Sequence, residues 1–211
     1  MNRALIVGLL LGLAAFAQRP LPPAQPHGNW WLAASADKRE GFLVGFYECG
    51  YMMRRPFAEL QDNLVVDAVR DYFAGSVALR SRSVVQAIQD LESGWKETGG
   101  IKFSVAAPSD EYDGDVWAGG GGLAARKEGI VLGFLECQET EMGLRPTLSP
   151  RDLTSRLDAL YGVSYDEQSL LQAKQDDEKL GPAILRFEGL KWPPPSDRRQ
   201  QSETRPTSAG R

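Results

Sequence analysis

Both cysteines of the chain lie in a repeated sequence, where each follows a glutamate. Residues 38–49 read KREGFLVGFYEC, and residues 126–137 read RKEGIVLGFLEC, so that Cys137 follows Cys49 by 88 positions. In an oxidising compartment two thiols are more often paired than free. We expect a Cys49–Cys137 disulfide, which needs a Cα separation of about 4.4–6.8 Å. The alternatives are one buried thiol in each copy, or a bond between two molecules.

The glutamates before the cysteines, Glu48 and Glu136, are the residues that could do acid–base chemistry. Paired carboxylates can act as general acid and base or hold a cation. A structural role is the simpler interpretation, in which each carboxylate accepts hydrogen bonds from a tryptophan indole or a loop amide. We favour that role and therefore predict no catalytic residue, no metal and no cofactor. Both glutamates remain candidate binding residues.

A second repeated motif carries tryptophan, as HGNWW at 27–31 and DGDVW at 113–117. Trp31 and Trp117 are expected to fill the core, although they are also candidate binding platforms. His27 is the only histidine of the chain and borders a proline-rich segment. Histidine-dependent nucleophile triads, HExxH zinc sites and histidine-rich metal sites are therefore disfavoured.

Glycines recur on one face of the helix predicted around each cysteine. Gly41 and Gly45 precede Cys49 at helical spacing, and Gly129 and Gly133 repeat the pattern. A glycine inside a helix costs about 1 kcal/mol relative to alanine. Matched glycines in both copies indicate a close backbone contact between the two helices. Such a contact across a pseudo-two-fold axis would also bring the thiols together.

Further helices are predicted around these two. Ser35 is expected to cap the first helix, and Ser149 followed by Pro150 to start the second helix of the second copy. An apolar stripe marks each second helix: Leu64, Val65, Ala68, Val69, Tyr72 and Phe73 in one copy, and Leu153, Leu157, Leu160 and Tyr161 in the other.

The third helix of each copy can be aligned in two ways. Residues 83–90 match 169–176. In the other alignment, residues 87–88 and 91–92 match 183–184 and 187–188, and the second copy carries a ten-residue insertion. Both alignments remain open. Residues 101–105 (IKFSV) are compatible with a short strand.

Two polar stretches have a functional and a simpler interpretation. The four glycines at 119–122 are expected to be a connector, because no Gly-Lys-Ser/Thr follows them as in a phosphate loop. The acidic residues 110–115 lack the alternating pattern of a calcium loop. Arg54 and Arg55 after the first helix of copy one contrast with Glu136, Glu139 and Glu141 in copy two. These charges either pair with each other or face a basic partner.

The amino terminus predicts export. A basic start, an apolar run to Phe16 and the small-x-small sequence Ala15-Phe16-Ala17 are typical of a secretory signal peptide. We expect no membrane association after cleavage, and a net charge of −4 disfavours nucleic-acid binding. The predicted organisation is a signal peptide at 1–17, a proline-rich leader at 18–26, helical repeats at 27–104 and 113–192, a linker at 105–112 and a disordered tail at 193–211.

The first repeat resembles a known family. The matching residues are Gly28-Asn29-Trp30-Trp31-Leu32, Ser35, Lys38 and Gly41 to Glu48, with a fainter echo at 114–137. This pattern is similar to the start of the amidase-immunity proteins of type VI secretion, the Rap/Tai-like immunity proteins. The resemblance implies a small, periplasmic, all-helical, disulfide-bearing protein that binds and blocks a cell-wall amidase. The chain departs from that family in being duplicated and in carrying one cysteine per repeat.

Together these features predict an all-α fold in which a roughly three-helix unit is duplicated and packed with pseudo-two-fold symmetry. The predicted function is a secreted or periplasmic, non-enzymatic binding or scaffold protein with a protein partner. The alternatives are an immunity protein that occludes a periplasmic cell-wall hydrolase, and a small hydrolase that uses Glu48 and Glu136.

Overall fold

The computed structural model describes residues 26–105, 117, 124–161 and 180–190. Within these ranges the protein is mostly helical, with one two-stranded sheet, which confirms the all-α part of the predicted fold class. The predicted signal peptide, the leader up to residue 25, the acidic stretch, the glycine run and the tail lie outside the described residues. None of the helices in the described ranges is long and apolar enough to cross a membrane.

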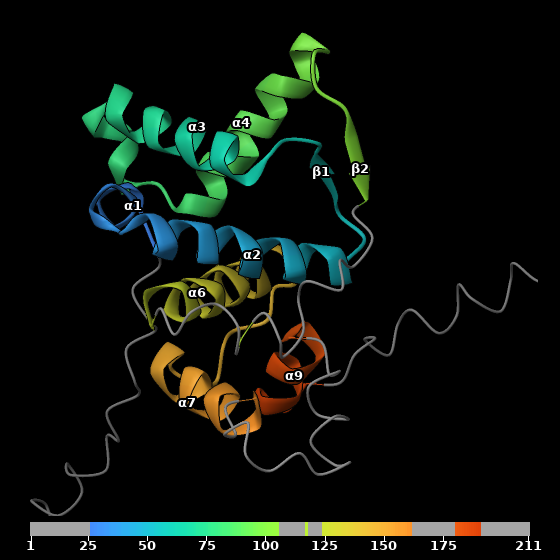
Figure 1. Ribbon diagram of the computed structural model, residues 1–211. Coiled ribbons are helices and arrows are strands. Elements are labelled where there is room, and N and C mark those ends of the chain that lie inside the picture. Colours follow the sequence, from blue (N-terminus) through green and yellow to red (C-terminus); the bar gives the residue numbers. More distant parts are fainter. Residues whose placement is uncertain (1–25, 106–116, 118–123, 162–179, 191–211) are drawn as a thin grey trace, which may run out of the picture.

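Two long helices, α2 (Ala36–Met52) and α6 (Ala124–Glu141), lie side by side at the centre of the molecule (Figure 1). α2 begins as predicted at Ser35, whose side chain accepts a hydrogen bond from the Lys38 amide at 3.3 Å. Both helices are buried over most of their middle turns, because other helices cover them on both sides. They carry the repeated glycines, glutamates and cysteines.

Outer helices cover this central pair on two sides (Figure 1). The layer next to α2 contains α1 (Gly28–Ala33), α3 (Asp62–Gly75), the short 3-10 helix η1 (Val77–Ser81) and α4 (Val84–Thr98). The layer next to α6 contains α7 (Pro150–Tyr161) and α9 (Leu180–Phe187). The buried apolar side chains of all layers form one continuous core.

The second helices largely match their predicted stripes. Ser149 caps α7, because its hydroxyl oxygen accepts a hydrogen bond from the Asp152 amide at 3.1 Å. The buried stripe residues are Val65, Val69 and Phe73 on α3, and Leu153, Leu157 and Tyr161 on α7. Leu64 was assigned to the α3 stripe, and this prediction is wrong, since the side chain is 49% exposed. It lies in the first turn, on the flank of the face that Val65 and Val69 define.

The described third helices are α4 and α9, which correspond to the alignment of residues 87–88 with 183–184. Ala87, Ile88, Ala183 and Ile184 are all buried. The rival match, residues 169–176, lies outside the described residues. α4 begins with a capping box between Ser83 and Gln86.

A small antiparallel sheet pairs the segment that follows α2 with the segment that follows α4. β1 (Pro56–Ala58) pairs with β2 (Phe103–Val105), with Phe57 opposite Ser104. The strand expected within 101–105 is therefore present, whereas β1 was not predicted. Phe57 is buried and packs against Phe46 and Tyr47 of α2.

Candidate functional site

The repeated glycines form the crossing point of α2 and α6. A Cβ atom on Gly45 would lie 2.8 Å from the carbonyl carbon of Ile130 and closer still to its oxygen. A Cβ atom on Gly133 would lie 2.8 Å from the carbonyl carbon of Phe42. Gly41 and Gly129 meet backbone of the opposite helix in the same way. The absence of side chains therefore allows backbone-to-backbone contact, as the spacing predicted.

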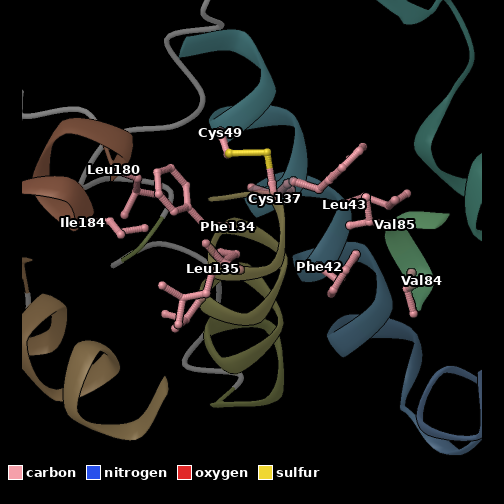
Figure 2. Packing of buried hydrophobic residues seen from close by; sticks show 14 of the residues in the cluster. Phe42, Leu43, Cys49, Val84, Val85, Phe134, Leu135, Cys137, Leu180 and Ile184 are labelled. Carbon is pink, nitrogen blue, oxygen red and sulfur yellow. A yellow bond between two sulfur atoms is a disulfide. The ribbon is translucent and has the colours of Figure 1, made fainter. Parts of the chain in front are cut away.

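The predicted disulfide is present at the end of this glycine strip. Cys49 and Cys137 are bonded, their Cα atoms are 6.1 Å apart, and neither side chain is exposed. Figure 2 shows the bond joining α2 to α6, with Leu43 on one side and Phe134 on the other. Because the loop between the two cysteines is long, the crosslink stabilises by about 4–5 kcal/mol on the chain-entropy model.

Glu48 reaches from α2 to the start of α9. Its Oε1 atom accepts a hydrogen bond from the Gly181 amide at 3.1 Å, and the residue is 3% exposed. The first amides of a helix have no partner within the helix, and the helix dipole favours negative charge there. Glu48 therefore acts as a capping group for α9, supplied from a residue far away in the sequence.

Glu136 accepts the corresponding hydrogen bond at the start of α4, from the opposite central helix. Its Oε1 atom accepts a hydrogen bond from the Val85 amide at 3.5 Å, and the residue is 3% exposed. Burial raises the pKa of this carboxyl to about 8, although hydrogen bonds from Ser83 and Val85 act in the other direction. The nearby charge of Glu139 adds to the increase. Near neutral pH the buried group is therefore largely protonated.

Both glutamates thus accept hydrogen bonds within the fold, which agrees with the structural role favoured from the sequence. The partners are backbone amides at helix starts, whereas a tryptophan indole had been an equal expectation. Each carboxylate is buried beneath an outer helix, and the two serve helices in different layers of the molecule. The structure therefore does not present them together on a surface that a substrate could reach.

Arg55 connects the two central helices with α4. Its Nη2 atom donates to Glu92 at 2.6 Å, and its Nε atom lies 3.6 Å from Glu141. The guanidinium also lies 4.9 Å and 5.0 Å from the ring centres of Phe46 and Phe57. Burial raises the pKa of Glu92, and the charge of Arg55 opposes the increase. The sequence left two possibilities for these charges, pairing with each other or facing a basic partner. Arg55 and Glu141, which belong to different predicted repeats, pair with each other.

Glu188 is a further buried carboxylate that the sequence analysis did not single out. It is 5% exposed and accepts hydrogen bonds from the amide and hydroxyl of Thr147 and from the Leu148 amide, the last at 3.1 Å. Glu92 and Glu188 follow the matched Ala-Ile pairs of α4 and α9 at the same interval. That repetition was the signal in the sequence that could have identified both of them.

The tryptophans of the repeated motif, Trp31 and Trp117, are core residues, so the structure does not present them as binding platforms. Trp31 and Trp117 are 0% and 1% exposed. The indole of Trp117 donates to Asp158 at 3.0 Å, and Lys127 donates to the same carboxylate oxygen at 2.6 Å. The Trp31 indole nitrogen is buried, and it has no hydrogen-bond partner among the residues that the structure describes.

His27 precedes α1, and its backbone forms an isolated antiparallel β-bridge with Ser83. The preceding residue, Pro26, is buried, and its carbonyl accepts a hydrogen bond from the Val84 amide at 2.9 Å. The last residue of the predicted leader is therefore packed against the start of α4. Within the described ranges, no three histidine, cysteine, aspartate or glutamate side chains are grouped so that they could hold a metal ion.

Comparison with known proteins gives no relative for this arrangement. No family model matches the chain, and neither a curated protein nor a solved structure shows significant similarity to it.

Proposed function

We propose that this chain is a secreted or periplasmic binding protein that acts without catalysing a reaction, and that its partner is another protein. The observation that carries the proposal is the role of Glu48 and Glu136. Both are buried, and each accepts a hydrogen bond from an amide at the start of an outer helix. The residues best suited to acid–base chemistry are therefore engaged in holding the fold together.

The buried disulfide supports the proposed location. Disulfides persist mainly in oxidising compartments, such as the periplasm and the extracellular space. Cys49 and Cys137 are the only cysteines of the chain, and both are used in the bond. The predicted signal peptide at 1–17 points to the same compartments.

A direct test combines binding with activity. The exported chain is purified and offered to the products of the genes that neighbour its own, and complexes are detected by size-exclusion chromatography and calorimetry. A stoichiometric complex with one of these proteins is expected. Hydrolysis of purified peptidoglycan by the chain, lost in Glu136→Gln but retained in a surface control such as Asp67→Asn, would overturn the proposal.

An immunity protein against a periplasmic cell-wall hydrolase is the second candidate, and the motif over residues 28–49 favours it. The motif describes mainly the framework, because Trp31, Phe42, Phe46 and Glu48 are buried. On this proposal the partner contacts the outer surface of the helices. Co-expression in the periplasm with a neighbouring hydrolase is expected to prevent lysis of the host cell, and continued lysis would exclude the immunity role.

A further inference from the structure

The contacts between α2 and α6 occur in reciprocal pairs. Gly41 lies against the backbone of Arg126, and Gly129 lies against the backbone of Lys38. Arg126 follows Lys38 by the same 88 positions that separate the two cysteines of the disulfide. Each helix thus offers the other the same contact that it receives, which is the property of an isologous interface.

The next turn of the crossing repeats this pattern. Gly45 meets Ile130 and Gly133 meets Phe42, and these pairs exchange roles at the same interval. The disulfide then joins two equivalent residues. A residue can bond to its own equivalent only close to a two-fold axis, so the axis passes near the disulfide.

The capping carboxylates extend the exchange to the outer helices. Glu48 binds the amide of Gly181, the second residue of α9, and Glu136 binds the amide of Val85, the second residue of α4. α4 belongs to the first half of the chain and α9 to the second. Each half therefore supplies the helix cap that the other half needs, and neither half is complete alone.

The outer layers have matched cores as well. Three buried residues of α3 and three of α7 are separated by the same interval as the cysteines: Val65, Val69 and Phe73 in the first half, and Leu153, Leu157 and Tyr161 in the second. Figure 1 shows the corresponding layers on opposite sides of the central pair.

From this reciprocity we infer that the chain is a covalently fused two-fold dimer, and that the partner fitting either half is the complementary half of a second copy. Two chains that exchange halves form a domain-swapped dimer. It contains the α2–α6 crossing twice, and both caps and the disulfide are then made between chains. The inference goes beyond the proposed function, because it requires no foreign partner.

The linked half has an advantage over a second copy, because covalent linkage within one chain gives an effective concentration on the order of millimolar. Refolding of the reduced chain should therefore yield monomer at low protein concentration, and swapped dimer in increasing proportion as the concentration approaches that range. The buried disulfide then traps whichever form has assembled.

Two single-cysteine variants of the full chain test the inference. Cys49→Ser and Cys137→Ser chains are unfolded, mixed at high concentration, refolded and oxidised. Exchange of halves brings Cys49 of one chain against Cys137 of the other, whereas in closed monomers each remaining thiol is buried opposite a serine. Non-reducing mass spectrometry should find a heterodimer with one Cys49–Cys137 bond. Neither variant refolded alone should give this dimer.

A measurement on the unchanged sequence keeps the test decisive if a serine variant fails to fold. Isotope-labelled and unlabelled wild-type chains are co-refolded, and Cys49–Cys137 peptides with one labelled and one unlabelled strand are counted. Such mixed peptides, in a dimer with the circular dichroism and tryptophan fluorescence of the monomer, support the inference. Crosslinks between identical cysteines, or monomer at every concentration, would overturn it.

Discussion

The glycine crossing gives the sharpest prediction, which compares Gly45→Ala with Gly94→Ala. Both glycines lie inside helices, so alanine should improve the helix propensity by up to about 1 kcal/mol at either site. At Gly94 the added Cβ atom meets no described residue within 4 Å, and a gain of about 0.5–1 kcal/mol is expected. At Gly45 the Cβ atom would lie 2.8 Å from the Ile130 carbonyl carbon and nearer to its oxygen.

The obstacle at Gly45 is backbone, which cannot move aside by a change of rotamer. Overpacking typically costs about 1–3 kcal/mol, and a rigid neighbour places this site at the upper end or above. After the propensity gain, the expected net loss is about 2 kcal/mol or more. The two substitutions should therefore differ by about 3 kcal/mol and have opposite signs.

Urea unfolding with the disulfide intact, followed by the fluorescence of the buried tryptophans, measures both values. Gly133→Ala should resemble Gly45→Ala, because Gly133 meets the Phe42 backbone in the same way. The double variant should lose less than the two losses added together, since one displacement of α2 from α6 relieves both clashes. A loss below about 0.5 kcal/mol at Gly45 would refute the close-contact argument, which requires a net loss of about 2 kcal/mol or more.

Three other predictions concern buried or strained groups. Glu136 has a pKa of about 8 in the folded protein against 4.5 unperturbed, so its contribution to stability is complete below pH 4.5 and is lost as the pH rises to about 8. In urea unfolding across this range, the free energy of unfolding of Glu136→Gln should depend less on pH than that of the wild type, and an equal pH dependence would contradict the protonated state. Trp117→Phe should lower the free energy of unfolding by about 1.5–3 kcal/mol more than Trp31→Phe, because only Trp117→Phe removes a hydrogen bond to a charged group, the one from the indole to Asp158. Equal losses of stability would argue against that bond. Arg54 is exposed and has a φ of 56°, a left-handed conformation that costs less for glycine than for arginine, so Arg54→Gly should stabilise the fold by about 1 kcal/mol and raise the thermal midpoint. A lower midpoint would indicate that the arginine side chain stabilises the fold.

Local patterns in the sequence were sufficient for the two central helices, for α3 and α7, and for several contacts. The period of the apolar residues and the caps at Ser35 and Ser149 predicted helices that the structure contains. The matched glycines predicted close approach, because a cost repeated at equivalent positions implies a common gain. The predicted export to an oxidising compartment and the equivalent positions of Cys49 and Cys137 predicted the disulfide.

Other features were decided only by the tertiary structure. Nothing near Glu48 in the sequence reveals that its partner is the amide of Gly181, because the two residues meet only when α9 packs on α2. The same holds for Glu136 and Val85, and for Arg55 between Glu92 and Glu141. Sequence periodicity defines which face of a helix is apolar, whereas the partner of a buried polar group depends on which helices meet. The requirement that a buried amide or carboxylate be satisfied applies to the assembled core, and only the assembled core shows how it is met.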